Sequence, residues 1–397
     1  MRISTSTYYQ QAVSSIDTQQ TSLSKIQQQM SASKRILTAS DDPVAMGQVL
    51  GVNKSIADTA QWTSNANDLQ TSLGLENTAL TTVNSALQQI QTLALQANNA
   101  SMSASDRKSL AAQMQQQLDA IVQQANAKDS SGRYLFGGTA DGSAPFSQGA
   151  SGVSYSGNSG VRMLSVGPTS EIAAGDPGDA VFMQLSSGDG NISVSGAAAN
   201  AGSASVTAAS VSDSGQYAGG SFTVSFSGGQ YQVTDGSGAT VASGSYTSGN
   251  TIQFGGVSLT LTGTPSNGDS FSVAPSTAQD LFSGVQQLIN AVANPGATAA
   301  QKAQNQTAVY NGLQFLQGAQ DHVVDTLSAV GSRTQAAQSV VSQLQSRTTQ
   351  LKSQLSNLQD LDYAAATAQF SQTQLTLQAA EQSYVQVQGL SLFNYLK

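Results

Sequence analysis

Few side chains in this sequence have the types and spacing that chemistry requires, and the carboxylate pairs Asp41-Asp42 and Asp360/Asp362 are the first candidates. Two neighbouring carboxyl groups can act as a general acid and a general base. Both pairs, however, lie where one helical pattern gives way to another, and a carboxylate there caps free amide groups and faces the positive end of the helix dipole. We therefore interpret Asp41, Asp42 and Asp362, together with Pro43, as structural caps.

The other candidates for chemistry are a lone histidine and a few aromatic residues. His322 cannot build a histidine cluster, and the sequence has no cysteine to complete a metal site. Neither a Gly-x-Ser-x-Gly nucleophile motif nor a phosphate loop ending in Gly-Lys-Ser/Thr occurs. Trp62, Tyr134 and Phe136 could stack on a sugar, but packing at a junction is the simpler interpretation. The sequence predicts no catalytic residue, no metal, no cofactor and no enzymatic activity.

The composition excludes several classes of partner. The formal net charge is -8, and the 15 Lys and Arg residues are scattered, so the clustered cations needed for nucleic acid are missing. No window of about 18 apolar residues occurs, which argues against membrane insertion. Residues 1–30 lack the apolar core of a Sec signal peptide, so an exported protein would have to use another route.

The chain changes character twice, near residues 130 and 277. Of its 37 glycines, 28 lie between residues 130 and 276, a segment whose only basic residues are Arg133 and Arg162. With 397 residues the chain exceeds the roughly 250 to 300 at which single cores stop growing. We expect an α+β protein with three parts: a terminal coiled-coil domain (1–40 and 360–397), a helical bundle stem (41–140 and 277–359) and an inserted β-rich domain (141–276).

The helical arms show apolar stripes. The N-terminal stripe predicts a helix that stops at Asp41-Asp42-Pro43, with Pro43 opening a second helix. Ser103 and Asp106 have the spacing of a capping box before a third helix. The clearest pattern is an alternating four-and-three repeat over residues 323–358, which predicts one long helix that needs partners along its length. A last helix follows Asp362.

The middle of the chain shows strand signals. Residues 222–226 and 231–235 alternate apolar and polar side chains around Gly228-Gly229, which predicts a hairpin. Residues 252–254, 257–261 and 271–273 are typical of further strands. For residues 196–214 the pattern fits a strand pair and an irregular loop equally.

Both ends of the chain are amphipathic and nearly uncharged. Such helices would leave an apolar stripe in water unless they packed on each other or on other copies of the chain. Both arrangements can apply one after the other, with packing within one chain first and packing between copies upon assembly. We predict an assembly interface that comprises Tyr9, Ile16, Leu23, Met30, Leu37, Phe370, Leu377, Tyr384, Leu392, Phe393 and Leu396.

Several short motifs, in order at both ends of the chain, resemble the flagellin-like axial proteins of the bacterial flagellum. They are Ser33-Lys34-Arg35-Ile36-Leu37, Ser40-Asp41-Asp42-Pro43-Val44, Asn67-Asp68-Leu69, Asp106-Arg107, Gly132-Arg133-Tyr134-Leu135-Phe136-Gly137-Gly138-Thr139, Asp362-Tyr363 and Ser391-Leu392-Phe393-Asn394-Tyr395-Leu396. The resemblance covers both arms, and within the family the proline after the double Asp, the Arg-Tyr-Leu-Phe-Gly-Gly-Thr run and the Leu-Phe-Asn-Tyr-Leu ending are more similar to the hook-filament junction branch than to flagellin.

The resemblance implies a structural subunit that is exported through the flagellar type III apparatus with the help of a cytoplasmic chaperone. It also implies a short ring of identical copies at the distal end of the hook, outside the cell, which joins hook-associated protein 1 to flagellin. Two alternatives stay open at this point. The chain could be a flagellin, which forms a long filament, or a secreted adhesin whose β-rich domain binds a host ligand.

Overall fold

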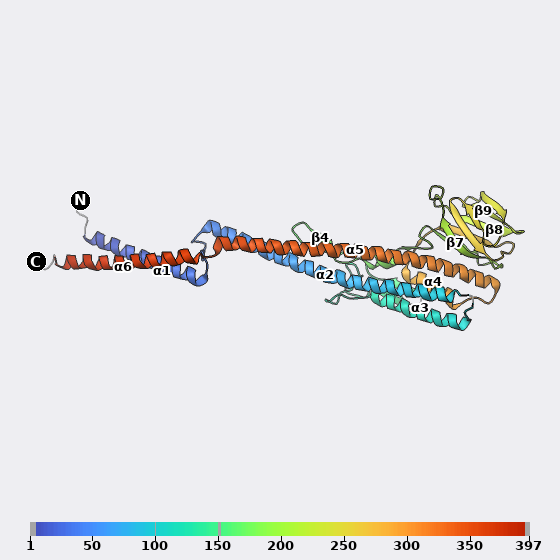
Figure 1. Ribbon diagram of the computed structural model, residues 1–397, viewed down its shortest axis with the longest axis horizontal. Helices are drawn as coiled ribbons and strands as arrows, with labels where there is room; N and C mark the ends of the chain where they lie inside the picture. Colours follow the sequence, from blue (N-terminus) through green and yellow to red (C-terminus); the bar gives the residue numbers. More distant parts are fainter. Residues whose placement is uncertain (1–4, 100, 150–151, 394–397) are drawn as a thin grey trace. The chain divides into compact units, whose positions relative to one another are not determined.

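The computed structural model describes residues 5–99, 101–149 and 152–393, and for residues 5–6 and 387–393 it describes the backbone alone. The fold is α+β, as the sequence predicts. Its helices are α1 (Thr5–Ala32), α2 (Pro43–Ala97), α3 (Ala104–Ala125), the short π-helix η1 (Asp179–Met183), α4 (Leu281–Ala293), α5 (Ala299–Gln359) and α6 (Tyr363–Phe393) (Figure 1). No helix within the described ranges has the length and apolar character needed to cross a bilayer.

Fourteen strands lie between α3 and α4. They are β1 (Phe146–Gly149), β2 (Gly152–Tyr155), β3 (Met163–Ser165), β4 (Glu171–Ala173), β5 (Leu185–Ser186), β6 (Ile192–Gly196), β7 (Ser205–Val211), β8 (Phe222–Ser227), β9 (Gln230–Asp235), β10 (Thr240–Ser245), β11 (Thr251–Phe254), β12 (Val257–Thr262), β13 (Ser270–Pro275) and β14 (Ala278–Gln279).

The chain forms two compact units. One contains residues 1–64 and 341–397, and the other contains residues 65–340. The three-part division expected from composition remains a prediction.

In the first unit, α1 and α6 lie side by side (Figure 1). Among the side chains of these two helices that the structure describes, those that are buried are Ile26 of α1 and Ala366 and Thr373 of α6. The first helix ends at Ala32, so the prediction that it continues to Asp41 is wrong. Ser33 has a φ of +57°, a left-handed conformation that cannot continue a right-handed helix. The second helix does begin at Pro43, as predicted.

In the second unit, α4 is held close to its neighbours by small residues and a cap. The Asp280 carboxylate accepts a hydrogen bond from the Ser283 amide and so caps α4. Gly284 lies against the Phe315 ring of α5, and a Cβ at this glycine would collide with that ring. The predicted capping box of Ser103 and Asp106 opens α3, and the predicted long helix is α5, which starts earlier than the repeat suggested.

Two antiparallel sheets pack face to face in the second unit. The five-stranded sheet has the order β10-β9-β8-β13-β6, and the three-stranded sheet has the order β11-β12-β7. Val224, Val233, Leu259 and Val273 are fully buried between them. The predicted hairpin is β8–β9, where Gly228 and Gly229 both have positive φ, as a tight two-residue turn requires.

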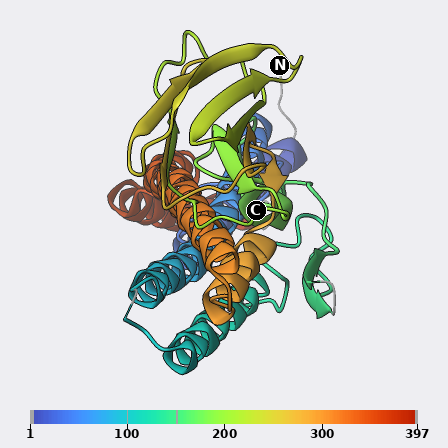
Figure 2. The same ribbon diagram turned by 90° about the vertical axis from the view of Figure 1, so that its right-hand side faces the viewer.

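Helix α5 covers an edge of this sandwich (Figure 2). The Val206 amide donates to the Thr307 hydroxyl over 3.1 Å, and the Ala209 amide donates to the Tyr310 hydroxyl over 2.8 Å. The Tyr310 hydroxyl donates in turn to the Ala209 carbonyl. The undecided segment 196–214 therefore contains an edge strand, β7, whose free backbone groups are satisfied by a helix.

Candidate functional site

The residues of the first motif lie where α1 ends, and they form a compact C-cap. The Ser33 amide donates to the Met30 carbonyl over 3.3 Å, and the Lys34 amide donates to the Gln29 carbonyl over 3.1 Å. These two bonds are those of a Schellman motif, with serine at the left-handed position that glycine usually occupies. The cap turns the chain sharply after α1.

After this turn, the chain pairs with the segment that separates α5 from α6. Lys34 and Asp360 form an antiparallel bridge. The Arg35 amide donates to the Gln359 carbonyl over 2.7 Å, and the Leu361 amide donates to the Ser33 carbonyl over 3.2 Å. Two segments more than 300 residues apart in sequence thus share a short piece of β-ladder.

Two side chains reinforce this backbone pairing. The Arg35 guanidinium donates to the Leu358 carbonyl over 2.8 Å and lies 3.6 Å from the Asp42 carboxylate. The Tyr363 hydroxyl donates to the Met30 carbonyl over 2.8 Å and lies 2.6 Å from the Ser33 hydroxyl. Arg35 and Tyr363 belong to the motifs that carry the family resemblance, but no local sequence pattern predicted that their two segments lie side by side. We call residues 29–36 and 358–363 the terminal junction.

The aspartates expected as caps divide into two kinds. Asp42 accepts a hydrogen bond from the Ala45 amide at the start of α2, and Asp362 accepts from the Ala364 and Ala365 amides at the start of α6. Asp41 is not a helix cap, which corrects the expectation for this residue. Its carboxylate accepts from the Leu37 and Thr38 amides, because the chain has already left α1 and folds into a loop there.

Asp41 also anchors this loop to α1. The Lys25 ammonium lies 2.8 Å from its carboxylate. The hydrogen bond from Lys25, followed by those from the Thr38 and Leu37 amides, holds the pKa of Asp41 well below its usual range. Three donors therefore stabilise the ionised form of this carboxylate.

The predicted assembly residues mostly line the seam between α1 and α6. Ile16, Leu23, Met30, Phe370, Leu377 and Tyr384 are half-buried, and the Tyr9 and Tyr384 rings lie 5.3 Å apart. Leu37 lies in the loop after α1. Leu392 and Phe393 belong to the last turn of α6, whose side chains are not described, and Leu396 lies outside the described residues. Whether these residues contact other copies remains a prediction.

Other apolar side chains of α6 point away from the seam. Leu375 is 62% exposed and Val385 is also exposed. Neither residue could be singled out from the sequence, because both fall outside the seven-residue repeat of α6.

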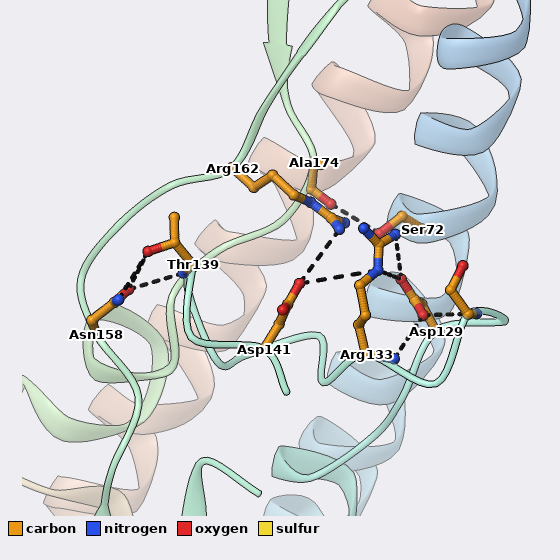
Figure 3. A network of polar contacts seen from close by, with 9 residues as sticks. Ser72, Asp129, Arg133, Thr139, Asp141, Asn158, Arg162 and Ala174 are labelled. Atoms are coloured by element: carbon orange, nitrogen blue, oxygen red, sulfur yellow. Dashed lines mark hydrogen bonds and ion pairs between the residues drawn. The ribbon is translucent and has the colours of Figure 1, made fainter. Parts of the chain in front are cut away.

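The second motif, which starts at Gly132, builds a network of polar contacts in the other unit (Figure 3). The Arg133 guanidinium lies 2.8 Å from the Asp129 carboxylate and 4.0 Å from that of Asp141. The Arg162 guanidinium lies 3.6 Å from the same Asp141 carboxylate. The only two basic residues of the segment 130–276 therefore neutralise acidic neighbours.

Electrostatics and backbone shape hold this network in place. Burial alone would raise the pKa of Asp129, but hydrogen bonds from the Arg133 amide and guanidinium and from the Ser131 amide outweigh it and lower that pKa. The Asn158 amide group pairs with Thr139, and the Asn158 carbonyl lies so close to Gly138 that a Cβ there would collide with it. The glycine pair allows this close approach.

The aromatic residues near this network are structural. Phe136 is fully buried and packs edge-to-face on Phe182 at 5.1 Å, so it cannot stack on a sugar. The Lys128 ammonium lies over the Tyr134 ring at 4.6 Å. In the first unit, the Arg347 guanidinium lies 5.8 Å from the Trp62 ring. His322 contacts the Ala180 carbonyl over 3.0 Å. In the described part of the chain, no three His, Asp or Glu side chains gather where a metal could bind.

The polar side chains of both regions thus link segments of the chain. Residues 3–141 match the model of the bacterial flagellin N-terminal helical region, and residues 313–396 match that of the C-terminal helical region. Residues 194–275 match the D2-like domain of flagellar hook-associated protein 1.

A curated relative supports a more specific placement. Flagellar hook-associated protein 3 of Salmonella typhimurium is 33% identical over 187 residues, which are 47% of this chain and 58% of the relative. The match therefore spans less than two thirds of that relative's length.

Two solved structures match over nearly their whole length and over about three quarters of this chain. FlgL of Xanthomonas campestris superimposes with a TM-score of 0.73 and 31% identity, over 77% of this chain and 99% of that chain. The flagellar junction protein FlgL of Legionella pneumophila superimposes with a TM-score of 0.68 and 28% identity, over 74% of this chain and 99% of that chain.

Proposed function

The chain belongs to the FlgL family of flagellar hook-associated protein 3, and from this premise we propose that it is the structural subunit that joins the flagellar hook to the filament. The observation that carries the proposal is the match to FlgL of Xanthomonas campestris over 99% of that chain, at 31% identity. The models of the flagellin N-terminal and C-terminal helical regions also match residues 3–141 and 313–396, which belong to the two helical arms.

The two ends of the chain have the features that assembly requires. The α1–α6 pair buries few side chains and carries exposed apolar residues, so contacts with other copies would complete its burial. Few charges lie on these helices, and identical copies can therefore approach without strong like-charge repulsion. We propose that copies form a short ring through α1 and α6.

The proposed partners are hook-associated protein 1 on the hook side and flagellin on the filament side. A cytoplasmic export chaperone and the flagellar type III apparatus would bring the chain to its place outside the cell. This role needs no cofactor and no catalysis. It agrees with the side chains of the terminal junction and of the Arg133 network, which link segments of the chain.

Deletion of the gene in its host tests the junction role. Electron microscopy of the cells should show hooks without filaments, and flagellin should appear in the medium because it is exported but cannot attach. A plasmid copy of the gene should restore the filaments. Loss of filaments without flagellin in the medium would indicate that this chain is itself the flagellin. Filaments still attached to hooks would contradict the proposal.

Point variants separate contacts within a chain from contacts between chains. Leu375→Asp changes an exposed apolar side chain, so the purified chain should keep its helical signal while the cells lose attached filaments. Leu377→Asp changes the seam itself and should reduce the helical signal as well. Gln374→Asp, on an exposed position about 100° around the helix from Leu375, is the control for the added charge and should leave attachment normal. Normal attachment in the Leu375→Asp strain would remove this surface from the assembly model.

A further inference from the structure

A buried acid lies in the middle of α2. The Glu76 side chain is 1% exposed, and its Oε1 accepts a hydrogen bond from the Asp176 amide over 2.9 Å. Its second oxygen, Oε2, has no hydrogen-bond partner among the described residues. A carboxylate in such a place would lose most of its hydration without full compensation.

Only one positive group faces the acids in this cluster. The Asp176 carboxylate forms an ion pair with the Arg333 guanidinium of α5. In the described structure, Asp176 and Arg333 are the charged groups that act on Glu76 from the elements packed against α2. One guanidinium thus serves two carboxyl groups.

This arrangement favours the neutral form of Glu76. Burial raises the pKa of Glu76 first, and the negative charge of Asp176 raises it further, to about 8. The Asp176 amide and the Arg333 charge act in the opposite direction but do not cancel these effects. When protonated, Glu76 can donate a hydrogen bond to the Asp176 carboxylate.

The same cluster ties a connecting segment to two helices. Residues 174–178 follow β4 and lead into η1. The Ser72 hydroxyl of α2 donates to the Ala174 carbonyl over 3.0 Å, Arg333 of α5 holds Asp176, and the Gly178 amide donates to the Phe136 carbonyl over 2.9 Å. The contact between Glu76 and Asp176 lies at the centre of these attachments.

We propose that Glu76, Asp176 and Arg333 form a proton-dependent latch, which holds residues 174–178 on α2 and α5 while Glu76 is protonated and loosens when Glu76 loses its proton. Loss of the proton leaves the buried Glu76 carboxylate beside the partly exposed Asp176 carboxylate, with one guanidinium to compensate both. The resulting repulsion acts on the connecting segment because Asp176 belongs to it.

The latch predicts how stability changes with pH. Because folding raises the pKa of Glu76, the protonated side chain stabilises the folded chain. This contribution to the free energy of unfolding is fully present below the ordinary glutamate pKa of 4.5 and is lost as pH rises through about 8. Between these limits the folding equilibrium constant should fall by up to about tenfold for each pH unit. Above about pH 8 the loss should level off.

The direct test follows the Glu76 carboxyl carbon by 13C NMR in the full chain, together with urea denaturation, from pH 4 to pH 9.5. The Glu76 signal should titrate near pH 8, and the stability of the unchanged chain should fall over this range. Glu76→Gln keeps the shape and removes the charge, so its stability should depend much less on pH. Titration of Glu76 near 4.5, or parallel pH curves for the two proteins, would overturn the proposal.

A local measurement distinguishes the latch from a general effect on stability. Trypsin cleavage after Arg162, which precedes the connecting segment, should be faster at pH 9 than at pH 7 relative to cleavage after Arg107 on α3. Glu76→Gln should abolish this difference. If that variant does not fold, Asp176→Asn serves instead, because it removes the neighbouring charge and should shift the Glu76 titration to lower pH. An unchanged titration in Asp176→Asn would also contradict the latch.

Discussion

The α1–α6 seam and the β-sandwich reach stability in different ways. The sandwich buries a continuous apolar core, in which Phe271 is 2% exposed and Val224, Val233 and Leu259 are fully buried. Along the seam, Ile26 is the one large apolar side chain that is buried among the described residues, with an exposed fraction of 9%. The sandwich is held by packing, whereas the terminal pair depends heavily on hydrogen bonds of the terminal junction.

This difference suits the proposed role. The sandwich needs no partner to complete its core, which is already closed. A terminal pair with an incomplete core can gain much of its stability from neighbouring copies, so its order is coupled to assembly. The exposed apolar residues of the first unit are therefore interpreted as candidates for contact with other copies, whereas the sandwich is interpreted as stable by itself.

Truncation of a core side chain in each region should show the largest effect. Phe271→Ala should cost about 3–5 kcal/mol, because it leaves a cavity in a closed core. Ile26→Ala should cost about 2 kcal/mol, at the low end of the range for such truncations, because the seam can relax toward solvent. Urea denaturation measures both, with near-UV circular dichroism for the aromatic core and far-UV circular dichroism for the helices. Equal costs would contradict the comparison.

Removal of the Tyr363 hydroxyl should have a smaller effect, confined to the terminal junction. Tyr363→Phe loses the bonds to the Met30 carbonyl and the Ser33 hydroxyl but keeps the ring. Tyr363 is 49% exposed, so the expected cost is about 1 kcal/mol, or about a fivefold increase in opening.

Trypsin measures this opening, since Lys34 and Arg35 are cleavable only when the short ladder is broken. Cleavage after Arg107 in the other unit is the control and should not change. If Tyr363→Phe increases trypsin cleavage after Arg107 as much as cleavage after Lys34 and Arg35, the hydroxyl stabilises the rest of the chain as well as the terminal junction.

Acid should loosen the same region through Asp41. Because folding lowers the pKa of Asp41, the ionised carboxylate stabilises the folded chain. This contribution to the free energy of unfolding is present above the ordinary pKa of 3.8 and is lost as pH falls from 3.8 toward the pKa of the folded state. The helical signal of the full chain should therefore fall less steeply in Asp41→Asn than in the unchanged chain below pH 4. In Lys25→Met, which lacks the largest cause of the shift, the pKa of folded Asp41 lies closer to 3.8, so the loss should be smaller and should be complete at higher pH. Identical acid curves for all three proteins would show that the loop does not depend on this carboxylate.

Features that depend on local pattern could be predicted from the sequence. The start of α2 at Pro43, the capping box of Ser103 and Asp106 and the hairpin around Gly228-Gly229 each follow from neighbouring residues. The apolar stripe of α5 follows from the four-and-three repeat over residues 323–358. Such features depend on helix and turn geometry, which a few residues determine.

Features that depend on distant partners could not be predicted. The pattern continued the first helix to Asp41, but pairing with residues 359–361 ends it at Ala32. Strand β7 was ambiguous because its edge is completed by Thr307 and Tyr310, about 100 residues later. Glu76 occupies an ordinary position in a helical pattern, and only its burial beside Asp176 distinguishes it.

The smallest predicted effect concerns the left-handed residue at the end of α1. Ser33→Gly and Ser33→Ala both remove the hydroxyl that meets Tyr363, so a comparison of the two isolates the Cβ. A Cβ is disfavoured at a φ of +57°, and Ser33→Gly should therefore be more stable than Ser33→Ala by about 1 kcal/mol. The rate of trypsin cleavage after Lys34 measures the difference, because this bond becomes accessible more often when the cap is weaker. If Ser33→Ala is as stable as Ser33→Gly, the turn after α1 is not fixed by its left-handed cap, and the ladder with residues 359–361 must impose it alone.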